Sequence, residues 1–182
     1  MISFKLLTQS NKLDIIPFLR LLNQNIPEDI LESRLTEMFT QGYKCVGIFD
    51  EDKLIGISGL WIMTKYYVGK HIEPDNVIIH PDYRGSGVGV ALMKWIYNYA
   101  ISQGCVASEL NCYVSNKAGQ KFWINQGYSV IGFHFQKQFT LSSYSFCFFC
   151  FYCSRFLIKK MEPVPLRGSH PSTYIVDEPS AA

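Results

Sequence analysis

The chain has 182 residues, a length that suits a single domain with one continuous core. Its 17 basic and 15 acidic residues give a net charge of +2, so no strong overall field favours nucleic acid or an anionic membrane as a partner. The six cysteines are even in number, but no apolar leader opens the chain, so reduced thiols and a cytoplasmic location are expected.

The first part of the chain predicts a strand, two helices and a hairpin. Residues 2–8 alternate as in an opening strand, and residues 13–22 carry apolar side chains at helical spacing. A second helix is predicted over 27–42, where proline suits the first turn and glycine the end. Two β-rich runs, 43–49 and 53–63, are divided by an acidic turn and indicate an antiparallel hairpin.

The second part predicts strands and helices in alternation. A short β-branched strand at 76–79 precedes a glycine loop and a helix over 88–101. A strand over 106–114, a helix over 116–125 and a final strand or bent hairpin arm over 128–139 follow. The predicted fold class is therefore α/β (α+β), with a mixed, mostly antiparallel central sheet flanked by helices.

The loop at 84–89 has glycines at three alternate positions, directly after a buried strand and at the start of a helix. Such a loop exposes backbone N–H groups at the positive end of a helix dipole, where phosphate binds well. A Walker loop would need a lysine followed by a hydroxyl residue, and the dinucleotide fingerprint would need a glycine where Val90 or Leu92 stands. Neither nucleotide motif fits.

The loop does resemble the motif Arg/Gln-x-x-Gly-x-Gly/Ala of the GNAT family of acyl-CoA N-acyltransferases, with Arg84, Gly87 and Gly89 in register. A second motif of that family is matched downstream, by Asn116-x-x-Gly-x-x-Phe-Trp-x-x-x-Gly-Tyr128. Two motifs at the expected separation are more specific than either alone. The resemblance extends through about Lys137.

The resemblance implies that acetyl-CoA binds together with an amine, which attacks the thioester directly. Backbone amides of the glycine loop would hold the CoA pyrophosphate, and the strand before it would pair with the pantetheine arm. A free N–H at Val77 or Ile78 would also polarise the thioester oxygen. The implied cofactor-binding residues are Val77, Ile78, Ile79, Arg84, Gly85, Ser86, Gly87, Val88, Gly89, Val90, Asn116 and Phe122.

The amine must lose a proton, and either Asp75 or Glu73 is expected to accept it; a solvated loop is the alternative interpretation of both carboxylates. The family commonly protonates the leaving thiolate with a tyrosine, but the matching residue here is Trp123. Indole does not supply protons at neutral pH. Tyr128 and Tyr113 are the substitutes, with simple packing as the alternative role for each.

The expected function is acetyl transfer to a primary amine of a small molecule or a peptide. A CoA-binding sensor or scaffold without catalysis is the alternative, and a protein-modifying acetyltransferase is another. No metal is expected, because His80 has no ligand partner at a suitable spacing. The sequence does not choose among acceptors.

Two parts of the chain are expected: an N-acetyltransferase domain over 1–137, and a tail over 138–182 that is first rich in aromatics and cysteine and then in proline. A membrane span over 139–158 is disfavoured by an arginine and several serines. Three cysteines at 147, 150 and 153 do not complete a zinc site. The apolar stretch 146–156 is expected to pack on the domain, to join a homodimer or to bind a membrane.

Overall fold

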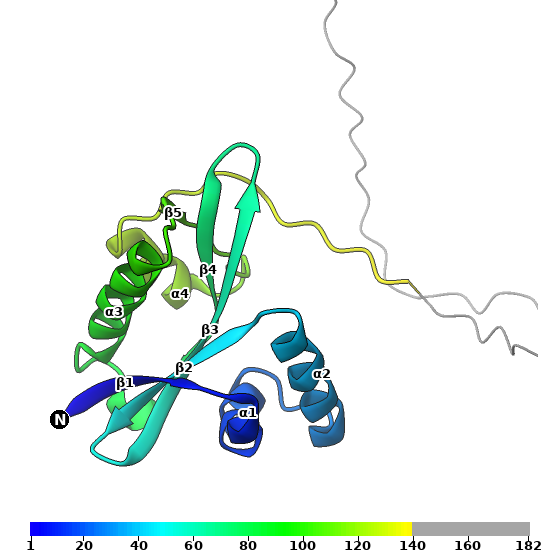
Figure 1. The fold of residues 1–182 in the computed structure, drawn as a ribbon, viewed down its shortest axis with the longest axis vertical. Helices are drawn as coiled ribbons and strands as arrows, with labels where there is room; N and C mark the ends of the chain where they lie inside the picture. Colours follow the sequence, from blue (N-terminus) through cyan, green and yellow to red (C-terminus); the bar gives the residue numbers. More distant parts are fainter. Residues whose placement is uncertain (140–182) are drawn as a thin grey trace, which may run out of the picture. The chain divides into compact units, whose positions relative to one another are not determined.

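The structure is a computed structural model that describes residues 1–139, of which Met1–Gln136 form one compact unit (Figure 1). The glycines at 42, 85, 87 and 104 and the acidic turn at 51–52 lie between elements, as the sequence predicts. The elements are β1 (Ile2–Leu7), η1 (Gln9–Asn11), α1 (Lys12–Leu22), α2 (Glu28–Thr40), β2 (Lys44–Asp50), β3 (Lys53–Lys65), β4 (Gly69–Ile79), η2 (Pro81–Tyr83), α3 (Val88–Ser102), β5 (Ala107–Ser108) and α4 (Lys117–Asn125).

The sheet has its five strands in sequence order, β1-β2-β3-β4-β5. The first four pair antiparallel, and β5 pairs parallel to β4. β3 and β4 form a long hairpin that extends beyond the other strands (Figure 1). The predicted class, a mixed and mostly antiparallel sheet flanked by helices, is confirmed.

Each face of the sheet carries its own hydrophobic cluster, because neighbouring strand residues point to opposite faces. Cys45 belongs to the cluster under α1 and α2, whereas Val46 belongs to the cluster under α3. Figure 1 shows these two sets of helices on opposite sides of the sheet. The fully buried members at the centre of the two clusters include Ile15, Ile16, Leu35 and Ile57 on one face and Ile48, Ile72, Leu92 and Ile96 on the other.

Three sequence-based boundaries are wrong. β4 begins at Gly69 rather than at Asn76, and β5 has two residues instead of the nine expected over 106–114. No strand forms over 128–139. Apolar alternation alone does not make a strand, which also needs an edge to pair with; β5 is too short to offer one. Ile131, Phe133 and Phe135 are therefore at least three-quarters exposed.

Within residues 1–139, no helix is long and apolar enough to cross a membrane. The predictions about a membrane span, three cysteines and a proline-rich end concern residues outside the described part of the chain.

Candidate active site

The glycine loop opens α3 with two residues in the left-handed backbone region. Gly85 has φ of 77° and Gly87, the N-cap of α3, has φ of 86°. No atom lies within 4 Å of the position that a Cβ would take at either glycine, so the loop surface is open. The N–H of Ala91 makes the first turn's bond to the Gly87 carbonyl. The preceding helical N–H groups, those of Val88, Gly89 and Val90, have no intrahelical acceptor.

The two polar side chains of the loop fasten it to the chain just before it. The Nε of Arg84 donates to the carbonyl of Ile79 at 2.9 Å, and the Oγ of Ser86 donates to the carbonyl of Tyr83 at 2.7 Å. The start of α3 is thereby held against the end of β4. An anion at this helix start would meet backbone N–H groups rather than a lysine.

β4 carries a β-bulge shortly before it reaches the loop. Its register with β3 shifts between Ile57 and Gly59. Two residues of β4, Asn76 and Val77, lie opposite the single residue between Ile57 and Gly59 on β3. Asn76 adopts φ of 49°, a conformation that asparagine tolerates better than most residues. The bulge re-aims the side chains and the backbone that follow it.

Among residues 1–139, β4 has a neighbouring strand on its far side only along its first half. β5 pairs with it at His71 and Ile72, and the N–H of Glu109 donates to the Ile72 carbonyl at 3.0 Å. Within residues 1–139, no backbone bond joins β4 to the following segment beyond that point. The second half of β4 is therefore a free edge next to the glycine loop.

The direction of the backbone groups along this edge follows from one hydrogen bond. The N–H of His80 donates to the Ile55 carbonyl of β3 at 2.8 Å. Because antiparallel partners alternate, Ile78 also faces β3, whereas Val77 and Ile79 turn their N–H and C=O groups away from it. Of the two N–H donors predicted for a thioester oxygen, this geometry favours Val77 over Ile78.

Asp75 lies just before the bulge as a half-buried carboxylate. Its Oδ2 accepts hydrogen bonds from Asn76 Nδ2 at 2.9 Å and from Trp61 Nε1 at 3.4 Å. Burial raises the pKa of Asp75, and the indole donor partly opposes that shift. No lysine, arginine or histidine of the described residues pairs with it.

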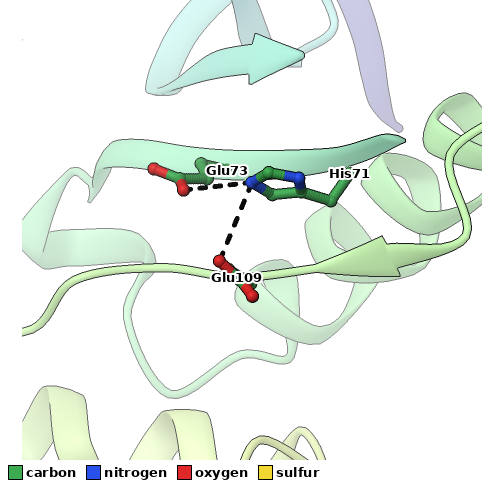
Figure 2. Close-up of side chains that lie close together, drawn as sticks. All are labelled: His71, Glu73 and Glu109. Atoms are coloured by element: carbon green, nitrogen blue, oxygen red, sulfur yellow. Dashed lines mark hydrogen bonds and ion pairs between the residues drawn. The ribbon is translucent and has the colours of Figure 1, made fainter. Parts of the chain in front are cut away.

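Glu73 lies on the same face of β4 and has a different environment. It pairs with the ammonium of Lys65 and with Nε2 of His71, the latter at 3.2 Å. Glu109 approaches the same two groups from the segment after β5 and lies 2.9 Å from Lys65 Nζ. It also lies 3.7 Å from His71 Nε2 (Figure 2). These hydrogen bonds to Lys65 lower the pKa of Glu109 and raise that of Lys65.

α4 brings the second motif against the glycine loop. Asn116 caps the helix, since its Oδ1 accepts from the N–H of Gly119 at 2.9 Å. A Cβ at Gly89 would lie 3.2 Å from the ring of Phe122 and 3.4 Å from the Ile79 side chain. Gly89 thus permits the close approach of α3, α4 and β4. This packing role is additional to the cofactor-binding role predicted for Gly89.

The aromatic residues after Phe122 pack together. The ring of Trp123 makes edge contacts with Phe122 and Tyr128, with centroids 4.9 and 5.7 Å apart. The hydroxyl of Tyr128 lies 2.6 Å from the Ser108 hydroxyl, and burial raises the pKa of Tyr128. Tyr113, the other predicted substitute acid, is 84% exposed.

Sequence reasoning missed three members of this region: Lys65, His71 and Glu109. His71 and Glu73 are two residues apart and share a face of β4, which is a visible signal once 69–79 is taken as a strand. Lys65 and Glu109 approach through the hairpin and through the parallel pairing, respectively, and neither distance follows from sequence spacing.

The family is decided by a comparison with family models. The model of the acetyltransferase (GNAT) family matches residues 16–128. The chain belongs to this family. A search of curated protein sequences finds no match.

Solved structures of the family share this fold. The match to glucosamine-6-phosphate N-acetyltransferase from Arabidopsis thaliana has 22% identity and a TM-score of 0.59, over 77% of this chain and 99% of that one. Ribosomal-protein-alanine N-acetyltransferase from Brucella melitensis biovar Abortus 2308 matches with 19% identity and a TM-score of 0.66, over 77% and 100%. The aminoglycoside N-acetyltransferase AAC(6')-Iy in complex with CoA matches with 14% identity and a TM-score of 0.66, over 76% and 94%.

Proposed function

We propose that this protein transfers the acetyl group of acetyl-CoA to a primary amine, by direct attack of the amine within a ternary complex. The observation that carries the proposal is the open glycine turn at the start of α3, directly beside the free edge of β4. Family membership and the fold support acetyl transfer. The acceptor and the roles of individual residues are our inference.

The residues present fit CoA. The N–H groups of the first turn of α3 suit the two phosphates of its pyrophosphate, and the space at the Cβ positions of Gly85 and Gly87 is open. Val77 and Ile79 would extend the sheet by bonding to the amides of the pantetheine arm. Phe122 would pack beside it. Helix capping uses only the Oδ1 of Asn116, so its Nδ2 group could donate hydrogen bonds to the cofactor. The group supplies an activated thioester, which is the acetyl donor.

Asp75 is the better of the two predicted bases. It is half-buried and has no cationic partner among the described residues, whereas Glu73 is held by Lys65 and His71. A carboxylate with a raised pKa is a stronger proton acceptor. Asp75 would take the proton from the attacking amine, as the new C–N bond forms and the C–S bond breaks.

The leaving thiolate does not depend on a strong acid in this chain. A thiol has a pKa of about 8.5, so its thiolate leaves unaided at a useful rate. Trp123 packs against two rings and supplies no proton. Tyr128 is a weak candidate, because its pKa is raised and its hydroxyl already bonds to Ser108.

The acceptor is proposed only as a class, a primary amine on a small molecule or a peptide. The three solved proteins above are named for glucosamine-6-phosphate, for a ribosomal-protein alanine and for an aminoglycoside, so the fold does not select one acceptor. A cytoplasmic location, a homodimer and the absence of nucleic-acid partners stay predictions.

The described cysteines Cys45, Cys105 and Cys112 are free thiols.

A CoA-binding sensor without catalysis is the second candidate, and Trp123 at the position of the family's tyrosine is the observation that favours it. The two are separated by an acceptor screen with small amines, polyamines, aminoglycosides and peptide N-termini, in which free CoA thiol and acetylated product are measured together. We expect equimolar product and thiol, with initial-velocity lines that intersect as a ternary complex requires. CoA binding without turnover on any acceptor would support the sensor.

A further inference from the structure

The side chains of His71, Glu73 and Glu109 converge on one point between β4 and the segment after β5 (Figure 2). His71 is fully buried, and the side chains of Glu73 and Glu109 are 16% and 13% exposed. One nitrogen of the histidine and one oxygen of each carboxylate all lie within 4.8 Å of one another. Two carboxylates this close need a positive charge beside them, and the ammonium of Lys65 supplies one by pairing with both.

The orientation of the histidine ring is decided by its other nitrogen. Nδ1 of His71 lies 3.1 Å from the carbonyl of Gly69, which can only accept, so Nδ1 carries the hydrogen. Nε2 is then the nitrogen that faces the two carboxylates, at 3.2 Å from Glu73 and 3.7 Å from Glu109, and it is the ring atom that would bind a metal ion. The ammonium of Lys65 bonds to both carboxylates, but no hydrogen bond joins it to Nε2 within the described residues.

We propose that His71, Glu73 and Glu109 form a binding site for one divalent transition-metal ion of the zinc type. One imidazole nitrogen and two carboxylate oxygens are a ligand set that such ions accept, with a further position left for water. The N–H of a metal-bound histidine is commonly donated to a backbone carbonyl, which is the arrangement at Gly69.

The distances suit an ion of that size. Bonds of about 2.0–2.2 Å in a tetrahedral site place the ligand atoms about 3.4 Å apart. The two contacts of Nε2, at 3.2 and 3.7 Å, bracket that value. Tyr67 donates to Glu109 at 3.0 Å from the side of the hairpin turn and would orient this carboxylate as an outer partner.

Lys65 competes with the ion, because its ammonium contacts the same oxygens, Oε1 of Glu73 and Oε2 of Glu109. Because of this competition, the proposal predicts opposite changes in metal affinity for the lysine and for the carboxylates, which a simple ion-pair network does not. Removing the lysine should strengthen metal binding, whereas removing a carboxylate should weaken it. The site is distinct from the function proposed for Asp75, which lies two residues after Glu73 on β4 and makes no hydrogen bond with the three ligands.

The test is a titration of the full-length, chelator-treated protein with Co²⁺, followed by visible absorption, and with Zn²⁺ in competition. We expect one equivalent of Co²⁺ to give ligand-field bands without the intense near-ultraviolet absorption of a cobalt–thiolate bond. Glu109→Gln should weaken binding about tenfold or more. Lys65→Met should tighten it. Glu32→Gln and Lys12→Met are the matched controls, since they break an ion pair between α1 and α2 and should leave Co²⁺ affinity unchanged.

Thiolate absorption would place the metal on cysteine and overturn the proposal. Equal affinity of wild type and Glu109→Gln would also overturn it. Absence of stoichiometric binding in both wild type and Lys65→Met would also overturn the proposal, because the variant has no competing ammonium. None of these readouts uses catalytic activity, so the metal site and the acetyl-transfer proposal can fail independently.

Discussion

The carboxylate of Asp75 accepts two hydrogen bonds, whereas the hydroxyl of Tyr43, buried on the same face of the sheet, has no partner among the described residues. Burial raises the pKa of both groups, because a charged form is poorly solvated there. In the proposed function, this carboxylate accepts a proton from a substrate amine at the free edge of β4. The hydroxyl lies inside the cluster under α1 and α2.

Asp75→Asn should lower the acetyl-transfer rate about 10²- to 10⁴-fold, because the amide cannot accept the proton of the amine. It should not lower the melting temperature, since it removes a carboxylate whose burial is unfavourable and keeps an oxygen for Trp61. Rates and thermal melts of the variant are compared with those of Asp52→Asn, at an exposed turn position. An unchanged rate in Asp75→Asn, with a loss in Glu73→Gln, would transfer the base to Glu73.

Tyr43→Phe should leave stability unchanged or raise it by about 1 kcal/mol, because it removes a buried hydroxyl that makes no hydrogen bond and retains the ring. The ring contacts Phe39 and Trp61, with centroids 5.5 and 5.2 Å away. Urea unfolding of both proteins measures the difference. A clear loss of stability would show that the hydroxyl has a partner, such as the neighbouring Asn76 side chain.

At the level of elements, the strand, glycine loop and helix around residue 85 are predictable from sequence, because β-branched residues, glycines and helical apolar spacing follow one another without interruption. The first half of β4 is not. Its face toward α1 and α2 carries His71, Glu73 and Asp75, and such polar residues do not form the apolar pattern that predicts a buried strand. The strand is stabilised instead by ion pairs and by its pairing with β3. Pro74 also argues against a central strand, but no β5 residue pairs with it.

β3 depends on a glycine beneath the Tyr43 ring. A Cβ at Gly59 would lie 2.5 Å from both Cε2 and the hydroxyl oxygen of Tyr43, whose ring packs against Trp61. Gly59→Ala should therefore destabilise the fold by about 1–3 kcal/mol through overpacking. Gly132→Ala, with no atom within 4 Å of the new methyl group, is the control and should change stability by less than about 0.5 kcal/mol. Equal unfolding midpoints for the two variants would contradict this packing.

At the scale of the whole molecule, family and sheet class follow from two motifs and the order of elements, because these are local patterns. The end of the sheet does not. Residues 128–139 alternate well enough to predict a strand, yet whether a strand forms depends on a free edge, and β5 pairs over only two residues. The cluster around His71 was missed for a similar reason, since its members meet only through pairing across the sheet.

The described members of both hydrophobic clusters, and the glycine loop, all lie within residues 1–128. We therefore predict that a chain ending after Gln138, which keeps all of them, has a CoA affinity and an acetyl-transfer rate within about twofold of the full chain. Gel filtration and activity of the two chains provide the comparison. An insoluble or inactive short chain would show that residues beyond 138 complete the fold.

The central claim, that the glycine loop at the start of α3 binds the CoA pyrophosphate, is tested most directly by calorimetry of CoA binding. Gly87→Val is compared with Gly104→Val, which has the same left-handed backbone and open surroundings at the other end of α3. Each substitution should cost about 1–2 kcal/mol in stability, since a left-handed valine is strained at both sites. We predict that wild type and Gly104→Val bind one equivalent of CoA and that Gly87→Val does not; undiminished affinity in a folded Gly87→Val would contradict the account.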